Sequence, residues 1–259
     1  MPDIDPIPAF DDNYIWLLSR PDAATAVVVD PGDEDPVMET LQRRGLALEA
    51  ILVTHKHGDH VGGIDGLLEA WPGIPVYGPA AEPIRRVTRP LGDGDRVDLP
   101  GLGLTLQVLE VPGHTEGHLA YVGDGALFCG DTLFAAGCGR VFSGTHEQLH
   151  HSLQRLAALP PSTRVFCAHE YTLANLGFAL WVEPDSTALR ERLQRERARR
   201  DAGEPTVPST LELELQTNPF LRTGEAAVIA AAERYAGGRL EDGAGVFTAI
   251  RNWKDREYD

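Results

Sequence analysis

The sequence predicts a layered α/β sandwich followed by a smaller helical region. Through the first 170 residues, apolar runs of strand length alternate with glycine-rich loops. Only a few segments of that part have helical spacing, which is the pattern of a sheet-based domain with helices packed on it. After about Tyr171 the pattern changes and helical periodicity dominates. We therefore expect two domains, a catalytic domain of residues 1–170 and a helical domain of residues 171–259.

The strands of the first domain are predicted from apolar runs and from period-two alternation. Residues 104–111 alternate between apolar and polar positions, as in a half-buried strand. The turn residues 123–125 read Gly-Asp-Gly between two apolar runs and predict a hairpin. A helix is expected over residues 35–45, where Gly45 supplies the stop. The predicted strands are residues 14–18, 26–30, 50–53, 75–78, 104–111, 119–122, 126–129 and 164–168.

The second domain is predicted to be built from helices. Residues 186–200 have Ser186 as N-cap and place Leu189 and Leu193 on one face. We expect the many arginines and glutamates of this helix to form a solvated face. Further helices are predicted over residues 209–215, 224–236 and 245–254.

Composition and charge exclude several classes of function. The net charge of −16 argues against binding to a phosphate backbone, which requires a basic face. No apolar run approaches the roughly 20 residues of a membrane span, and the first residues lack the pattern of a secretory signal. The three cysteines form no Cys-x-x-Cys unit and suit a reducing compartment. We expect a cytoplasmic monomer with neither a nucleic-acid nor a membrane partner.

The segment with the clearest chemical meaning is residues 54–60, which read Thr-His-Lys-His-Gly-Asp-His directly after a predicted strand. Imidazole and carboxylate groups together suit zinc, iron or manganese, whereas calcium prefers oxygen ligands. The alternative is a solvated polar turn. Only nine histidines occur in the chain, so chance would produce this pattern on the order of once in a thousand chains. We therefore predict a metal site whose first ligands are His55, His57, Asp59 and His60.

Three further candidate ligands also follow predicted strands. His114, Asp131 and His169 each lie one to three residues past an apolar run. Strand ends can meet at one edge of a sheet, so we expect all seven side chains to converge there. Seven ligands are too many for one tetrahedral ion and suit two adjacent ions. Asp30, at another strand end, is expected to brace a ligand loop, and His118 to lie beside the metals without ligating.

The motifs in this order resemble those of the metallo-β-lactamase superfamily. The superfamily motifs are Thr-His-x-His-x-Asp-His, then Gly-His-Thr at 113–115, Gly-Asp-Thr at 130–132 and Ala-His-Glu at 168–170. Within the superfamily the chain resembles the glyoxalase II, or hydroxyacylglutathione hydrolase, family. That narrower likeness rests on Asp-Asn-Tyr at 12–14, Gly-Cys-Gly-Arg at 137–140 and Arg-Asn-Trp-Lys-Asp at 251–255.

The resemblance implies a four-layer αββα sandwich with a smaller C-terminal helical domain. It also implies two divalent metal ions per chain, zinc by preference with iron or manganese as alternatives. His55, His57 and His114 would hold one ion, and Asp59, His60 and His169 the other. Asp131 would bridge the two, and Asp59 and Asp131 are the expected catalytic carboxylates.

The implied reaction is hydrolysis of a glutathione thioester. A hydroxide activated by the two ions would cleave S-D-lactoylglutathione and related 2-hydroxyacyl-glutathiones to glutathione and D-lactate, the second step of methylglyoxal detoxification. Glutathione carries two carboxylates, so a strongly acidic protein must place cations beside the metals. By resemblance the substrate-binding residues are Arg140, Tyr171, Arg251 and Lys254.

Three alternatives remain open at the level of sequence. A persulfide dioxygenase of the same superfamily would use a single iron and O₂ and would lack the tail of Arg251 and Lys254. An RNA-processing metallonuclease would share the histidines but fits poorly with the acidic charge. A metal-free binding or scaffold protein is disfavoured, because every ligand position is filled.

Overall fold

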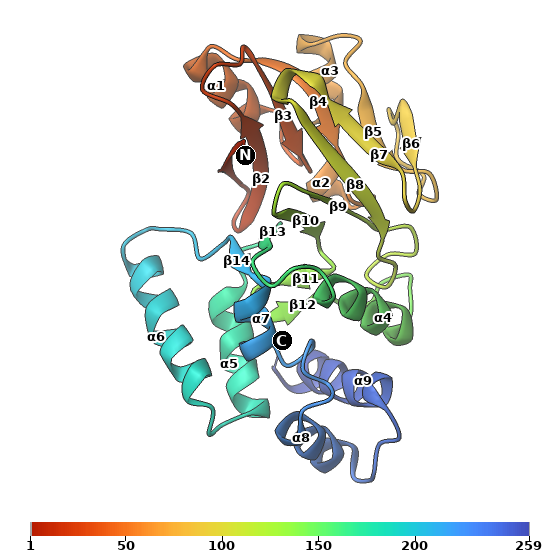
Figure 1. The fold of residues 1–259 in the computed structure, drawn as a ribbon, viewed down its shortest axis with the longest axis vertical. Coiled ribbons are helices and arrows are strands. Elements are labelled where there is room, and N and C mark those ends of the chain that lie inside the picture. Colours follow the sequence, from red (N-terminus) through yellow and green to blue (C-terminus); the bar gives the residue numbers. More distant parts are fainter. Residues whose placement is uncertain (1, 259) are drawn as a thin grey trace. The chain divides into compact units, whose positions relative to one another are not determined.

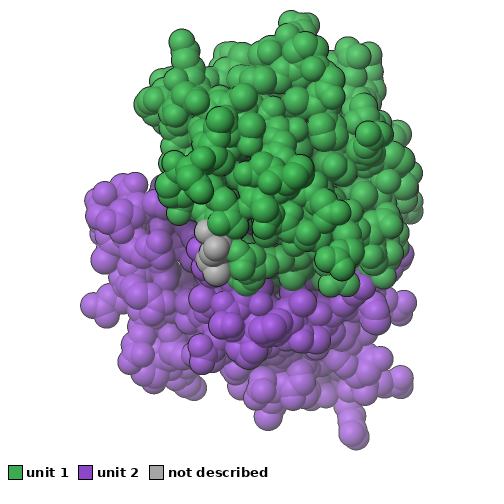
Figure 2. All heavy atoms as spheres, turned by 45° about the horizontal axis from the view of Figure 1, so that its top comes forward, with its two compact units in different colours: residues 1–110, 115–130 green, residues 111–114, 131–259 purple. Residues whose placement is uncertain are grey.

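The computed structural model describes residues 2–258 and divides into two units of closely packed residues, which are coloured separately in Figure 2. The first unit comprises residues up to Glu110 together with Thr115–Gly130. The second comprises Val111–His114 and the residues from Asp131 onward. Within residues 2–258 no helix has the length and apolar character needed to cross a lipid bilayer.

The first unit contains a six-stranded mixed sheet and a run of four antiparallel strands (Figure 1). The mixed sheet has the order β1-β2-β3-β4-β5-β6, with antiparallel pairing from β1 to β3 and parallel pairing from β3 to β6. Its strands are β1 (Asp3–Ala9), β2 (Asn13–Ser19), β3 (Thr25–Val29), β4 (Ala47–Leu52), β5 (Val76–Pro79) and β6 (Arg89–Leu91). The antiparallel run is β7 (Arg96–Leu99), β8 (Leu104–Glu110), β9 (Leu119–Gly123) and β10 (Ala126–Gly130).

Two helices cover one face of the mixed sheet. The helix α1 (Asp35–Arg44) buries Val37 and Leu41, and α3 (Ile64–Ala70) buries Ile64 and Leu67 in the same apolar cluster as the sheet. As predicted, α1 ends at Gly45, whose left-handed φ of 65° lets its N–H return to the last carbonyls. The short helix α2 (Gly58–Val61) begins inside the predicted ligand motif, and a 3₁₀ turn, η1, covers Pro100–Leu102.

The second unit is mainly helical. Its helices are α4 (His146–Ala157), α5 (Thr172–Val182), α6 (Thr187–Asp201), α7 (Leu211–Thr217), α8 (Ala226–Ala236) and α9 (Gly243–Trp253), followed by a π-helical turn, η2 (Lys254–Tyr258). Its short strands are β11 (Leu133–Phe134), β12 (Gly137–Cys138), β13 (Arg164–Cys167) and β14 (Ser209–Thr210). β11 pairs antiparallel with β12, and β13 with β14. α5 and α6 share an apolar cluster that includes Leu176 and Leu189.

The structure confirms the predicted strands and the hairpin of β9 and β10, and it corrects one prediction about α6. The charged residues of this helix were expected to form a solvated face, which is wrong for Arg192 and Glu196. Their exposed fractions are only 1% and 2%. Arg192 is buried because it is paired with Glu214 of α7, with nitrogen and oxygen 2.5 Å apart. A charge pattern along a helix does not reveal a partner from another element.

Candidate metal centre

The backbone between the end of β4 and the ligand motif of the first unit is held by hydrogen bonds. Val53 and Thr54 are buried, and their carbonyl groups accept hydrogen bonds from β9, a strand of the antiparallel run. The Tyr121 hydroxyl donates to Val53 O at 2.7 Å, and Leu119 N donates to Thr54 O at 2.9 Å. The direction in which the following histidines leave the strand is therefore fixed by the sheet.

The four candidate ligands of this motif lie close together in pairs. His55 Nε2 lies 3.0 Å from His57 Nδ1, which is near enough for both nitrogens to bind one ion. His60 Nε2 lies 3.5 Å from the Asp59 carboxylate. Asn13 Nδ2 donates to Asp59 Oδ2 at 3.0 Å and so orients this carboxylate. This role of Asn13 could not be predicted beyond its place in the Asp-Asn-Tyr motif, because a single asparagine beside a strand has no distinctive pattern.

Asp30 braces the ligand loop, as its place at a strand end predicted. Its carboxylate accepts hydrogen bonds from Thr54 N and Thr54 Oγ1, both at 2.7 Å, and lies 3.0 Å from His60 Nδ1. This carboxylate favours a proton on Nδ1 and leaves Nε2 of His60 as the ligating nitrogen. His118 is also buried, and its ring stacks on that of His55 with centroids 4.6 Å apart.

The second unit brings its own three candidate ligands together. Asp131 lies between two histidines: its Oδ2 is 3.5 Å from His114 Nε2, and its Oδ1 is 3.4 Å from His169 Nε2. Each carboxylate oxygen of Asp131 therefore faces a different histidine. His114 Nδ1 lies 2.8 Å from Arg140 O and donates to it, so Nε2 is the nitrogen available to a metal.

The donor set fits divalent transition metals. Imidazole nitrogens and carboxylate oxygens are the ligands that zinc, iron and manganese accept. The five histidines and two aspartates include no thiolate, which would favour softer metal ions. Within residues 2–258 these side chains form two candidate metal-binding groups, one with three histidines and an aspartate, the other with two histidines and an aspartate. Two groups are consistent with a binuclear site.

The predicted substrate-binding residues differ in accessibility. Arg140 is exposed, and its Nε lies 3.7 Å from Asp255 Oδ1. Tyr171 is also exposed, and its ring stacks on His169 with centroids 4.8 Å apart. Arg251 is buried, and its guanidinium donates to Cys138 O at 3.1 Å and to Asp255 Oδ1 at 2.8 Å. Lys254 is buried as well, with its Nζ 5.7 Å from the centre of the Tyr258 ring.

The cysteines of the second unit are unsuited to nucleophilic catalysis. Burial raises the pKa of Cys138 to about 11, although Arg251 opposes the shift. Burial likewise raises the pKa of Cys167 to about 12. Thiols with such pKa values are protonated near neutral pH and react slowly. Cys138 and Cys167 are therefore not candidates for a catalytic nucleophile.

The chain is similar to known proteins over nearly its whole length. The family profile of the metallo-beta-lactamase superfamily matches residues 10–169, and that of the hydroxyacylglutathione hydrolase C-terminus matches residues 170–257. A hydroxyacylglutathione hydrolase of Alkalilimnicola ehrlichii is 57% identical over 99% of this chain and 100% of its own length. One of Xanthomonas euvesicatoria is 51% identical over 96% of each chain. The crystal structure of TTHA1623 in a di-iron-bound form has a TM-score of 0.59 at 29% identity, covering 83% of this chain and 99% of that one.

Proposed function

Because the chain belongs to the hydroxyacylglutathione hydrolases of the metallo-beta-lactamase superfamily, we propose that it cleaves S-D-lactoylglutathione and related 2-hydroxyacyl-glutathiones to glutathione and D-lactate. The observation that carries the proposal is the match of residues 170–257 to the hydroxyacylglutathione hydrolase C-terminus. The histidine motifs alone are common to a superfamily, whereas this second match selects one branch of it.

We propose that two divalent ions are bound, zinc by preference and iron or manganese as alternatives. His55, His57 and His114 would hold one ion, Asp59, His60 and His169 the other, and Asp131 would bridge them. The donor types support this assignment, and so do the oxygens of Asp131, each of which faces a different histidine. When bound, such a pair of ions lowers the pKa of water to about 7 and polarises the substrate carbonyl.

The protein's own side chains would orient the reactants. Asp59, held by Asn13 at 3.0 Å, is placed to accept a proton from the attacking water. The C–S bond then breaks and glutathione leaves as a thiolate. Because a thiol has a pKa of about 8.5, this leaving group needs little help from a general acid. The proposed reaction therefore needs no nucleophile from the protein, which agrees with the raised pKa values of the Cys138 and Cys167 thiols.

We propose that the glutathione part is bound by Arg140 of the catalytic domain, residues 1–170, and by Tyr171, Arg251 and Lys254 of the helical domain, residues 171–259. Arg140 and Tyr171 are the accessible members of the proposed set, and a guanidinium can pair with a carboxylate through two hydrogen bonds. Arg251 and Lys254 complete it as buried cations. The proposed setting is the cytoplasm, with the protein acting as a monomer on a small molecule.

The decisive experiment is an assay of purified protein on S-D-lactoylglutathione in the absence of oxygen. We expect release of free thiol, with neither sulfite formed from a persulfide in air nor cleavage of RNA. Protein that binds zinc, iron or manganese but releases no thiol with any of them would refute the proposal. Sulfite formation would instead support the dioxygenase alternative.

A variant pair ties this activity to the metal ligands. His57→Ala should lose both turnover and full metal loading, measured by elemental analysis. His151→Ala is the matched control, because His151 is exposed on α4. The control should keep both properties. Full turnover in His57→Ala would remove that residue from the site.

A further inference from the structure

A small buried hairpin of the second unit joins two residues of the proposed site. Its strands β11 and β12 have two residues each and pair Leu133 with Cys138 and Phe134 with Gly137. Asp131 lies two residues before the first strand of the hairpin, and Arg140 lies two residues after the second. Residues 131–139 are all buried. The hairpin therefore connects the proposed bridging carboxylate to a proposed substrate cation.

The segment that follows the hairpin packs closely against two candidate ligands, Asp131 and His114. Gly139 N donates to Thr132 O at 3.4 Å. A Cβ atom at Gly139 would lie 2.0 Å from Asp131 O and 2.9 Å from His114 Nδ1. No side chain larger than hydrogen fits there, so the return strand is packed on the backbone of Asp131. A shift of the hairpin would move Asp131 with it.

Such a short hairpin cannot fix its own position. Two-residue strands supply few hydrogen bonds, and isolated hairpins are marginally stable even when they are longer. Its turn is also conformationally demanding, since Ala136 has a φ of 56° in the left-handed region. The turn must therefore be held by groups outside the hairpin.

Two asparagines and a glutamate from neighbouring helices hold this turn. Asn218, at the end of α7, donates through Nδ2 to Phe134 O at 3.2 Å and to Gly137 O at 2.9 Å. Asn175 of α5 donates to Ala135 O at 3.1 Å. The Glu214 carboxylate accepts from Ala136 N at 2.7 Å.

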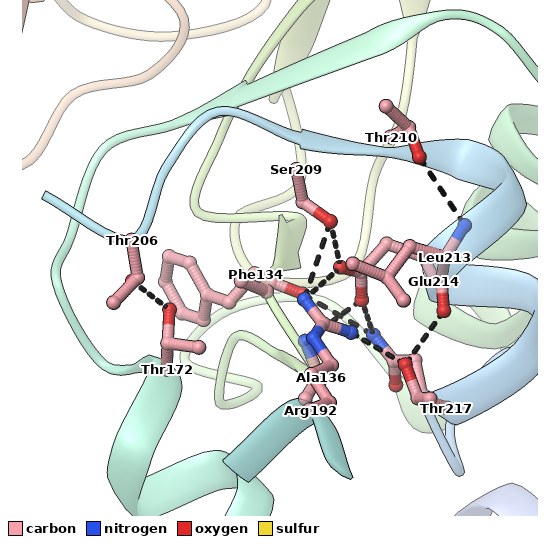
Figure 3. A network of polar contacts seen from close by, with 12 residues as sticks. Phe134, Ala136, Thr172, Arg192, Thr206, Ser209, Thr210, Leu213, Glu214 and Thr217 are labelled. Atoms are coloured by element: carbon pink, nitrogen blue, oxygen red, sulfur yellow. Dashed lines mark hydrogen bonds and ion pairs between the residues drawn. The ribbon is translucent and has the colours of Figure 1, made fainter. Parts of the chain in front are cut away.

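Glu214 and Asn218 are themselves held by a buried polar network, shown in Figure 3. Arg192 lies 2.5 Å from Glu214 Oε1 and also donates to Thr217 Oγ1 at 2.5 Å. Ser209 donates to the same carboxylate oxygen at 2.5 Å. Asn218 is oriented at both ends of its amide, because Phe220 N donates to its Oδ1 at 3.1 Å. We call the groups that bond to the hairpin, Asn218 and Glu214, the inner end of the network. Ser209 and Thr217, which bond to Glu214 and Arg192, form its outer end.

We propose that Asn218 and Asn175 are positioning residues for the reaction, acting on Asp131 through the β11–β12 hairpin. The inference rests on the proposed function, which makes Asp131 a bridging ligand. Neither asparagine touches the substrate or a metal in this scheme. Removing either one frees the hairpin and lets the bridging carboxylate drift from its place.

Two variants test the inner end of the network and two controls test its outer end. Asn218→Ala removes both amide bonds to the hairpin carbonyls, and Asn175→Ala removes one bond from a different helix. Thr217→Val and Ser209→Ala remove buried hydrogen bonds to Arg192 and Glu214, but neither residue contacts the hairpin. The readouts are kcat, KM, thermal midpoint, and the chelator concentration that removes half of the bound zinc.

We expect the two asparagine variants to lose about ten-fold or more in kcat and to release zinc at a lower chelator concentration. The controls should lose thermal stability to a similar extent but keep kcat and zinc retention within about two-fold of the parent. Asparagine variants that match the controls in both readouts would show a purely structural network and overturn the proposal. If Asn218→Ala does not fold, Asn175→Ala decides the question alone. An inactive parent refutes the proposed function instead, since that result appears before any variant is compared.

Discussion

At the scale of single residues, hydrogen-bond acceptors beside Nδ1 determine which ring nitrogen of a candidate ligand can face a metal. His60 has Asp30 behind its Nδ1 at 3.0 Å, and His114 has the Arg140 carbonyl behind its Nδ1 at 2.8 Å. Each acceptor keeps the proton on Nδ1 and leaves Nε2 for the metal. Asp30 does more than this, because it also accepts two hydrogen bonds from Thr54 and so holds the loop itself.

Asp30→Asn should therefore weaken metal binding, although the two side chains have nearly the same size and shape. The asparagine oxygen can still accept from Thr54 N, but its amide N–H would replace Oδ2, face His60 Nδ1 and reverse the preferred tautomer. We expect metal affinity to fall about 10- to 100-fold, measured by competition with a chromogenic chelator. The matched control is Asp33→Asn, since Asp33 lies in the same loop and its carboxylate accepts from Asp35 N, an exposed bond that does not involve a candidate ligand. Equal affinity in both variants would mean that the tautomer of His60 is set by another group.

At the scale of elements, a buried ion pair joins α6 to α7. Arg192 and Glu214 are almost completely buried, and their charges are satisfied by each other and by the surrounding hydroxyl groups. A buried ion pair contributes little net stability compared with apolar side chains, but removing one partner leaves a charge without compensation. The Glu214 carboxylate also accepts a hydrogen bond from the backbone N–H of Ala136.

Arg192→Met should destabilise the protein by about 3–5 kcal/mol, because it leaves the Glu214 carboxylate in the core without its cation. The free energy of unfolding in urea measures this loss. Arg195→Met on the same helix is the control: Arg195 pairs with Glu196 at 2.9 Å, but its side chain is 52% exposed. Solvent screening limits its contribution to roughly 0–1 kcal/mol. Similar losses in the two variants would contradict the assignment of Arg192 to the core.

Elements differ in how far the sequence reveals them. The strands with clear alternation or long apolar runs, such as β8 and β2, could be predicted. β1 could not, because Pro6 and Pro8 usually argue against a strand, although prolines are tolerated in a strand with one free edge such as β1. α5 is apolar on most sides, so its sequence lacks the stripe that marks an amphipathic helix. The β11–β12 hairpin is too short to have any periodicity.

At the scale of the whole molecule, the candidate ligands could be predicted more completely than the groups that support them. Metal ligands belong to few residue types, and here each follows an apolar strand, so His114 and His169 were found from local sequence. Asn13, Asn175 and Asn218 were not, because an asparagine is ordinary in loops and at helix ends. Their roles depend on partners far away in the sequence, such as the hairpin carbonyls that Asn218 reaches.

The same long-range construction predicts that metal binding stabilises the whole fold. The proposed ligands run from His55 to His169, so an unfolded chain cannot hold them together and the ions bind the native state selectively. At a free zinc concentration of about 100 times the dissociation constant, the native state should gain about 2.7 kcal/mol. For a chain of this size that gain corresponds to a rise of roughly 5–10 °C in the thermal midpoint.

Scanning calorimetry of the protein after chelation, and again after zinc is restored, measures this rise. The midpoint should increase further with each added increment of zinc, because the effect depends on the free concentration. His57→Ala is the control, since the loss of one proposed ligand should flatten the dependence on zinc while His151→Ala leaves it intact. A midpoint that does not respond to zinc in the parent would mean that the ions are not part of the native structure.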